Sequence, residues 1–401
     1  MAISIPGIGD LTLVQNYIYN SKKDNIIVMG APGTGKTILA VSMLEKIKNE
    51  AKVKNISFIV YNKTLHHELI KKYPSFIRTF DSWTFCMIRD NLLEKGLSHD
   101  DCKKKIIENY SNEQYNYNWD VISKEFEEKY GGSKLFGYIF IDEAQDIPSG
   151  ALEFIKKYTE KIYIFYDDNQ KINTDGNSEI LRIFDAEEKF YDLTINFRNT
   201  KEIEKVINLF NKEITNNGVT IRASTAKKRG SRPVLLNVGD RYDLLIEKIK
   251  DMQMKNSSET IGLLIPQYKY RFDNPYYGQI LFIRIKNLLS KHKVKYKAMF
   301  NSEEDNFSDD KAKVYLLSNN TAKGLEFDHV FLLDVNNPNM RYDTERYKKA
   351  FYVAMSRAKK NLYFCYDDKK EDSLITSTLK SNQKLIVEDT LIEEDLEELF
   401  D

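Results

Sequence analysis

A loop that can hold a phosphate chain lies near the start of the sequence. Residues 30–37 read GAPGTGKT and fill the pattern G-x-x-x-x-G-K-[ST], whose glycines let backbone N–H groups close around a polyphosphate. Lys36 can reach the outer phosphates, and the Thr37 hydroxyl can ligate Mg²⁺. The motif therefore predicts a site for a nucleoside triphosphate with Mg²⁺. The remaining expected contacts are Gly30, Ala31, Gly33, Thr34 and Gly35.

A second motif supplies two adjacent carboxylates at the end of an apolar run. Residues 138–146 read YIFIDEAQD, which predicts a buried strand that delivers Asp142 and Glu143 to its carboxyl end. Open α/β sheets bind their ligands at that edge. We expect Asp142 to hold Mg²⁺ and Glu143 to polarise the attacking water, which is the division of labour that phosphoryl transfer needs.

The elements that must position these residues follow from short apolar runs that alternate with helical stretches. Residues 25–29 predict the strand before the phosphate loop, and residues 38–44 predict the helix behind it. Further runs that predict strands occur at 56–60, 138–141, 162–165, 261–265, 314–317, 330–333 and 362–365. This alternation predicts an α/β fold with parallel sheets flanked by helices, and the number of strands is too large for one small sheet.

We therefore expect two domains and a tail. The first domain spans 1–215 with a small helical insertion at about 87–134, and the second spans 216–375 after a joint near 216–232. Residues 376–401 are expected to form an acidic C-terminal tail, either docked through its apolar positions or solvated and frayed.

Bulk composition excludes several classes of protein. The 401 residues carry a formal net charge of +0, so no global field draws the chain to nucleic acid or to an anionic membrane. The three cysteines lack C-x-x-C spacing, which argues against a disulfide framework and against structural zinc. No export signal and no apolar run of eighteen residues is found, so we expect a cytoplasmic protein that does not span a membrane.

The ordered motifs resemble those of superfamily 1 helicases of the UvrD/Rep type, over residues 15 to about 362. The resemblance implies two RecA-like domains with ATP in the cleft between them. It implies that Gln15 reads the adenine edge, that Phe197 stacks on adenine and that Glu326 contacts the ribose, with Gly324 in the same motif. Three side chains are expected to sense or clamp the γ-phosphate: Gln170, Arg198 and Arg357.

Nucleic-acid contacts are also implied by the resemblance, on residues of the segments that resemble motif Ia (60–63), the TFDSW segment (79–83) and motif V (321–327). The candidates are Tyr61, Asn62, Thr79, Ser82, Trp83 and Thr321. Two readings of the aromatics stay open, because Trp83 and Tyr61 can form a base-stacking track with the basic stretch at 227–232 or can be buried in the core. Asp81 stands where the family has histidine, and a carboxylate there would repel a phosphate backbone.

Three functions fit these features. The first is an ATP-driven motor on single-stranded nucleic acid, with DNA favoured. The second is an ATP-gated switch or loading subunit that controls a protein partner, such as a nuclease in DNA repair or anti-phage defence. It is favoured by the small size, the neutral charge and the acidic tail. The third, a degenerate nucleotide-binding scaffold, conflicts with the intact catalytic set.

Overall fold

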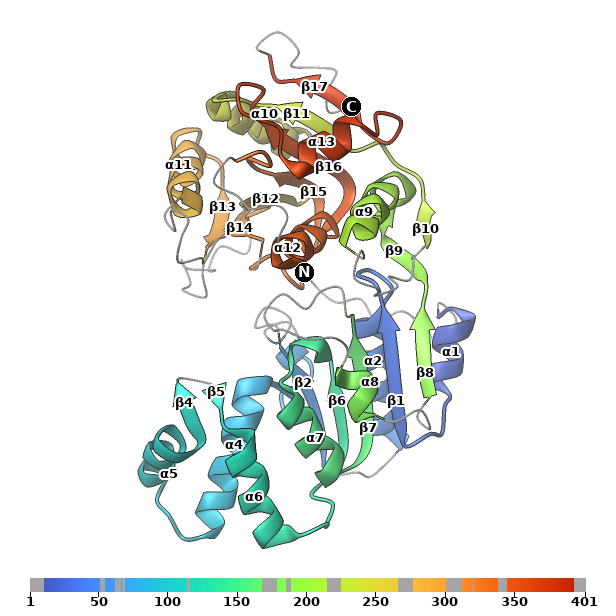
Figure 1. The fold of residues 1–401 in the computed structure, drawn as a ribbon, viewed down its shortest axis with the longest axis vertical. Helices are drawn as coiled ribbons and strands as arrows, with labels where there is room; N and C mark the ends of the chain where they lie inside the picture. The colour runs from blue at the N-terminus through green and yellow to red at the C-terminus, as the bar shows by residue number, and fades with distance from the viewer. Residues whose placement is uncertain are drawn as a thin grey trace. The chain divides into compact units, whose positions relative to one another are not determined.

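A computed structural model describes residues 11–50, 55–61, 66, 69–113, 116–167, 179–184, 189–214, 225–265, 277–300, 312–319, 321–337 and 345–392. The chain divides into two compact units. The first comprises Met1–Ala31 and Gly35–Leu193, and the second comprises Pro32–Thr34 and Thr194–Asp401. Both are built from helices packed on parallel strands, as Figure 1 shows.

The first unit contains a six-stranded sheet of order β3-β2-β6-β7-β1-β8, in which every neighbouring pair is parallel. Its strands are β1 (Asn25–Gly30), β2 (Ile56–Val60), β3 (Ile77–Thr79), β6 (Phe136–Ile141), β7 (Thr159–Tyr166) and β8 (Lys189–Leu193). Its helices are α1 (Leu13–Tyr19), α2 (Lys36–Glu50), α4 (Phe80–Glu94), α5 (His99–Lys105), α6 (Trp119–Tyr130), α7 (Ser149–Tyr158) and α8 (Glu179–Ile183).

Alternation along the strands divides the core of this unit into two layers. Ile26, Val28 and Phe58 face one side, where they pack with buried residues of α1 and α2. Ile27 and Ile59 face the other side, where the buried residues of α4, α6, α7 and α8 gather. Successive side chains of a strand point to opposite faces, so a sheet covered on both sides needs strands that are apolar throughout.

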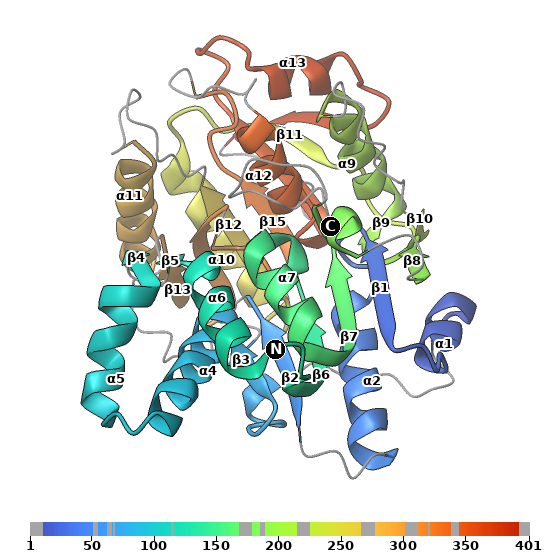
Figure 2. The same cartoon turned by 60° about the horizontal axis from the view of Figure 1, so that its bottom comes forward.

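The insertion predicted at about 87–134 is mainly helical, but it also holds a short hairpin. Helices α4, α5 and α6 are joined by the π-helix Ile106–Tyr110 and by the antiparallel strands β4 (Ser111–Glu113) and β5 (Asn116–Tyr117). Figure 2 shows these elements together beside β2 and β6. Buried side chains of α4 and α6 belong to the same core as the sheet, so the insertion packs as part of the first unit.

The second unit contains a seven-stranded parallel sheet of order β13-β14-β12-β15-β16-β11-β17. Its strands are β11 (Val234–Asn237), β12 (Ile261–Ile265), β13 (Tyr296–Met299), β14 (Val314–Ser318), β15 (Phe327–Leu332), β16 (Ala358–Tyr366) and β17 (Val387–Thr390). A separate parallel pair joins β9 (Ile195–Thr200) and β10 (Thr225–Lys228). Its helices are α9 (Lys201–Ile214), α10 (Tyr242–Lys255), α11 (Tyr277–Lys291), α12 (Glu345–Met355) and α13 (Leu374–Lys380).

Helices lie on both faces of this sheet as well. Buried residues of α10 and α11 pack with Phe331 and Tyr363 on one face. On the opposite face, Phe351 of α12 lies 5.9 Å from Phe364 and 5.4 Å from Phe210 of α9 between ring centroids. The predicted α/β class with parallel sheets flanked by helices is therefore confirmed.

Two predicted boundaries are wrong. The division between units falls after Leu193 and not at 215, because β8 pairs with β1 while the next strand, β9, belongs to the second unit with α9. Residues 376–401 are not simply a tail, because β17 pairs in parallel with β11 at the edge of the second sheet. The predicted acidic end at 393–401 lies outside the described residues.

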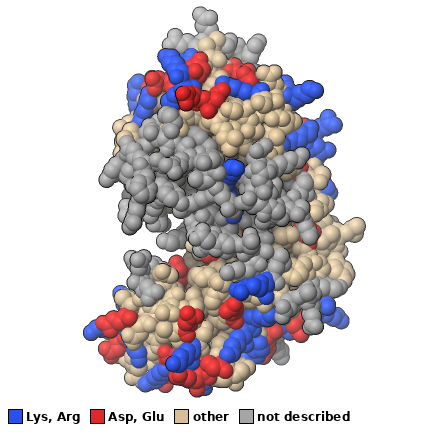
Figure 3. Space-filling view, viewed as in Figure 1, with Lys and Arg blue, Asp and Glu red and all other residues tan. Residues whose placement is uncertain are grey.

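On the face shown in Figure 3, basic and acidic side chains are interspersed on both units, in agreement with the formal net charge of +0. Within the part of the chain that the structure describes, no helix has both the length and the apolar character needed to cross a membrane.

Candidate nucleotide site

The phosphate loop connects the end of β1 to the start of α2. Gly33 has φ +78° and Gly35 has φ +86°, a backbone region that other residues rarely adopt. A Cβ on Gly35 would also lie 2.8 Å from Nε2 of Gln15. Both glycines are therefore required by the loop conformation, and the loop leads directly into the fifteen-residue helix α2.

Lys36 is the first residue of α2, and its ammonium group turns back into the loop. Nζ donates to the carbonyl oxygen of Gly30 at 2.7 Å and to that of Ala31 at 3.2 Å. These oxygens are neutral acceptors, whereas a phosphate oxygen is an anionic acceptor that forms the stronger charge-assisted bond. The side chain is thus held at the loop that the sequence assigns to phosphate.

Thr37 and Asp142 are brought together from positions that are distant in sequence. Asp142 follows β6 and is 1% exposed, and its Oδ2 accepts a hydrogen bond of 2.6 Å from Oγ1 of Thr37. Burial, and then the neighbouring charge of Glu143, raise the pKa of Asp142 to about 6, against the opposing effects of Thr37 and Lys36. The paired hydroxyl and carboxylate oxygens are hard ligands of the kind that Mg²⁺ prefers.

Glu143 adopts a backbone conformation that is unusual for a glutamate. Its φ of +55° and ψ of +43° place it in the left-handed region, directly before the 3-10 helix Ala144–Asp146. Such a conformation costs about 1–3 kcal/mol and persists where the surroundings hold it. Here Glu143 N donates to Oδ1 of Asp142 at 3.1 Å, and the Glu143 carboxylate accepts a hydrogen bond from Gln145 Nε2.

In the second unit, the predicted residues Arg198 and Glu326 form an ion pair. Arg198 Nε donates to Oε2 of Glu326 at 2.9 Å, and one terminal nitrogen of Arg198 donates to the carbonyl oxygen of Ser356 at 3.3 Å. Lys359 Nζ lies 3.8 Å from the other Glu326 oxygen. Burial raises the pKa of Glu326, but the charges of Arg198 and Lys359 outweigh it, so the pKa is lowered overall.

Arg357 is a large polar side chain that is buried in the second unit, with 2% of its surface exposed. Its guanidinium donates to the carbonyl oxygen of Val353 at 2.9 Å, to that of Leu325 at 3.3 Å and to Oγ of Ser356 at 2.9 Å. Backbone acceptors of its own unit therefore fix its orientation. The predicted contact with a γ-phosphate stays a prediction.

The predicted adenine and ribose residues have different surroundings. Gln15 is buried at the start of α1, where Thr12 N donates to its Oε1 at 3.0 Å and Gln15 N donates to Thr12 Oγ1 at 3.2 Å. This is a capping box, which stabilises the helix start independently of any ligand. Phe197 is exposed, with Lys227 Nζ 5.9 Å from its ring centroid. Gly324 has φ +81°, so the motif V turn requires glycine.

The structure separates the two aromatics that were candidates for base stacking. Trp83 is 3% exposed and packs 5.5 Å from the ring of Phe136, so for this residue the buried reading is the correct one. Tyr61 is 41% exposed and stays a candidate. Thr79 caps α4 by accepting a hydrogen bond from the backbone of Ser82, which is itself exposed.

Three further predicted residues complete this comparison. Thr321 Oγ1 donates to the carbonyl oxygens of Ser318 and Met299 at 3.0 and 3.1 Å, so its hydroxyl supports the turn after β14. Gln170 and Asn62 lie outside the described residues. Their predicted roles at the γ-phosphate and on nucleic acid stay predictions.

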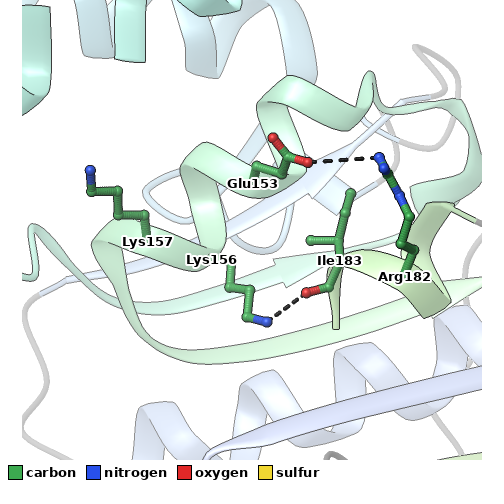
Figure 4. A pocket seen from close by; sticks show the side chains of 5 residues that line it. All are labelled: Glu153, Lys156, Lys157, Arg182 and Ile183. Atoms are coloured by element: carbon green, nitrogen blue, oxygen red, sulfur yellow. Dashed lines mark hydrogen bonds and ion pairs between the residues drawn. The ribbon is translucent and has the colours of Figure 1, made fainter. Parts of the chain in front are cut away.

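One hollow of about 480 Å³ lies between α7 and α8, away from the motifs described above. Figure 4 shows the residues that line it. Lys156 Nζ donates to the Ile183 carbonyl oxygen at 2.5 Å. Nη2 of Arg182 lies 3.9 Å from Oε1 of Glu153. Lys157 is paired with Glu127. The lining therefore holds three cationic side chains and one carboxylate.

Sequence reasoning missed two residues that support the site. Gln145 and Lys359 contact Glu143 and Glu326, respectively. Gln145 belongs to the DEAQD segment, so its position two residues after Glu143 was a usable signal. Lys359 carried no such signal, because a lysine two residues after Arg357 is typical of a solvated strand start.

Comparisons with known proteins identify the family. The model of the UvrD-like helicase C-terminal domain matches residues 34–369, which is well over half of the chain. A protein of Acanthamoeba polyphaga mimivirus named "Putative ATP-dependent DNA helicase" is 27% identical over 248 residues, which cover 58% of this chain and 34% of that protein. The chain thus spans about a third of this relative's length.

A solved structure, the C-terminal domain of a possible DNA helicase from Lactobacillus plantarum WCFS1, is 19% identical and covers 48% of this chain and 98% of its own. Its TM-score of 0.32 is too low to support an argument about the fold. The match to the family model agrees with the order of the sequence motifs and with the parallel α/β units. The chain therefore belongs to the family of the UvrD-like helicase C-terminal domain, and the resemblance to UvrD/Rep-type helicases is confirmed.

Proposed function

We propose that this protein is an Mg²⁺-dependent ATP hydrolase of the superfamily 1 helicase type, which couples hydrolysis to movement on single-stranded nucleic acid, with DNA favoured. The observation that carries the proposal is the 2.6 Å hydrogen bond between Thr37 and the buried Asp142, with Glu143 as the next residue. It unites the phosphate loop with the strand-end carboxylates. The name of the mimivirus relative supports ATP and DNA as the substrates to test first.

The residues of the first unit divide the chemistry among them. Lys36 and the loop amides bind the phosphates, with phosphate oxygens replacing the carbonyl acceptors of the lysine. Thr37 and Asp142 would hold Mg²⁺, which would supply neutralisation of phosphate charge. Glu143 orients the attacking water and accepts its proton, while the water oxygen bonds to the γ-phosphorus and the bond to the β–γ bridging oxygen breaks.

The residues of the second unit are assigned to the same nucleotide on the strength of the resemblance. Arg198 and Arg357 would stabilise charge on the γ-phosphate. An arginine in this role increases kcat by about 10³- to 10⁵-fold. The Arg198–Glu326 ion pair supports this assignment, because it holds two predicted nucleotide residues side by side. Gln170 is proposed as a γ-phosphate sensor, and Gln15 and Phe197 as adenine contacts.

Measurements of steady-state ATPase activity test the proposal. The activity is measured without nucleic acid and with single-stranded DNA, single-stranded RNA or duplex. Lys36→Ala should lose nucleotide binding or turnover, whereas Lys48→Ala, an exposed lysine at the other end of α2, should match the wild type. Glu143→Gln should bind ATP with turnover reduced by about 10² to 10⁴. Glu153→Gln, an exposed glutamate on α7, is the matched control.

The pattern of stimulation distinguishes the motor from the alternative function. Strong stimulation by one type of single strand supports a motor and names its track. Low turnover in all conditions, despite ATP binding, supports the ATP-gated switch that controls a protein partner. Wild-type turnover by Glu143→Gln would contradict the catalytic assignment itself.

A further inference from the structure

Gln145 is a buried glutamine whose side chain uses both ends of its amide. It lies in the 3-10 helix that follows Glu143 and is 3% exposed. Its Nε2 donates to Oε2 of Glu143, and its Oε1 accepts a hydrogen bond of 3.0 Å from the backbone N–H of Asp167. Asp167 directly follows β7, so this one side chain connects the ends of two neighbouring strands, β6 and β7.

The two partners fix the orientation of the amide. A backbone N–H can only donate, so the group facing Asp167 must be the carbonyl oxygen. An ionised carboxylate can only accept, so the group facing Glu143 must be the NH₂. A flipped amide would lose both bonds and bring oxygen against oxygen. The environment therefore specifies an amide, and neither a carboxylate nor an apolar side chain of similar length can replace both contacts.

Glu143 needs such a restraint. Its backbone already occupies the left-handed region, and its side chain has three rotatable bonds before the carboxylate. A donor on one carboxylate oxygen limits the rotation of the side chain. Preorganised orientation of a catalytic group accounts for a large part of rate enhancement, and small misplacements are costly.

From these contacts we infer that Gln145 is a positioning residue for phosphoryl transfer: it holds the Glu143 carboxylate in place and anchors it to the end of β7. This inference rests on the proposed role of Glu143 in ATP hydrolysis. It also links Glu143 to the segment that leads from Asp167 toward Gln170, the proposed γ-phosphate sensor, three residues further along the sequence.

Two variants separate positioning from simple packing. Gln145→Met has similar length and loses both hydrogen bonds. Gln145→Glu keeps an acceptor for Asp167 N but loses the donor to Glu143 and adds a like charge beside it. Gln279→Met, an exposed glutamine of α11, is the control for the substitution itself. Binding of a fluorescent ADP analogue and the unfolding temperature show whether each variant is folded.

The experiment compares kcat and KM for ATP in these variants with those of the wild type. Loss of a hydrogen bond to a charged group predicts a fall in kcat of about 10- to 100-fold for Gln145→Met and a larger fall for Gln145→Glu. KM and ADP affinity should stay within about twofold, because a change confined to the transition state lowers kcat and kcat/KM equally. In Glu143→Gln, adding Gln145→Met should cause no further loss, because the positioned carboxylate is already absent.

Several outcomes would overturn the inference. If Gln145→Met unfolds at a lower temperature but keeps the wild-type kcat, the glutamine only packs the turn. If Gln145→Met lowers kcat by the same factor with and without Glu143→Gln, it does not act through Glu143. Both results overturn the inference alone, whereas wild-type turnover by Glu143→Gln overturns the proposed function and the inference with it.

Discussion

The raised pKa of Asp142 makes the proposed metal ligand a source of instability when no metal is bound. In the folded chain this pKa lies at about 6, against an ordinary value of 3.8. The difference corresponds to about 3 kcal/mol of cost for keeping the carboxylate ionised. Asp142→Asn removes the charge, so we expect the variant to be more stable than the wild type in EDTA at pH 8.

The sign of the pH dependence follows from proton binding. Between pH 3.8 and about 6 the folded protein holds a proton on Asp142 that the unfolded chain has released, so the cost appears as the pH rises through this range. Below this pH range the cost of ionising Asp142 vanishes, and above the range the cost is constant. About half of the change, roughly 1.4 kcal/mol, falls between pH 5 and pH 8. The asparagine has one acceptor oxygen instead of two, so it loses one of the hydrogen bonds from Thr37 and Glu143. This loss reduces the stability gained by Asp142→Asn by about 1 kcal/mol at every pH.

Tryptophan fluorescence is suited to this assay, because both tryptophans of the chain, Trp83 and Trp119, are buried in the first unit with Asp142. Urea unfolding of the wild type and of Asp142→Asn in EDTA at several pH values gives the difference in unfolding free energy directly. The difference cancels the contributions of carboxylates that do not interact with Asp142. A variant that is less stable by the same amount at pH 5 and pH 8 would refute the reasoning.

Three more perturbations test the packing and electrostatics. Trp83→Ala should lower the unfolding free energy by about 3–5 kcal/mol, and Tyr61→Ala should lower it by less, because Tyr61 is 41% exposed. Unchanged stability in Trp83→Ala would restore a surface role for the indole. Gly262→Ala places a Cβ 2.5 Å from the buried Phe327 ring and should lower the unfolding free energy by about 1–3 kcal/mol, measured by thermal unfolding followed by circular dichroism. Gly132→Ala is the control, because a Cβ there meets nothing within 4 Å. The lowered pKa of Glu326 means that its ion pairs stabilise the fold above its ordinary pKa of 4.5 and that this contribution is lost as the pH falls through the lowered pKa. Glu326→Gln should therefore be less stable than the wild type at pH 7 and approach it below pH 4; an offset independent of pH would contradict this.

Much of the central architecture could be predicted because buried parallel strands are apolar on both faces. The runs at 25–29, 138–141 and 261–265 are short and apolar throughout, which is typical of strands buried on both faces. Each is a strand in the structure. Strand β17 was missed because its residues, Val387–Thr390, are mostly polar and lie at the sheet edge. Its place is set by backbone pairing with β11, which leaves little trace in side-chain pattern.

The boundary between units was misplaced for a related reason. Sequence breaks at Asn216–Gly218 suggested a linker, yet the change of unit takes place between β8 and β9, which only Thr194 separates. A connection of one residue between two strands needs no glycine, proline or polar run. Local composition can mark flexible linkers, but it cannot mark a point where one strand ends and the next begins in another sheet.

The same limit applies to the candidate site. Residue type and spacing predict which groups can bind phosphate or Mg²⁺, because those requirements are chemical and local. They do not predict that Thr37 donates to Asp142 across 105 positions, or that the Asp167 amide fixes the orientation of Gln145. Both contacts arise where parallel strands of one sheet end at the same edge. A glutamine in an acidic motif becomes interpretable only when both of its partners are known, since the pair decides which end of the amide faces the catalytic carboxylate.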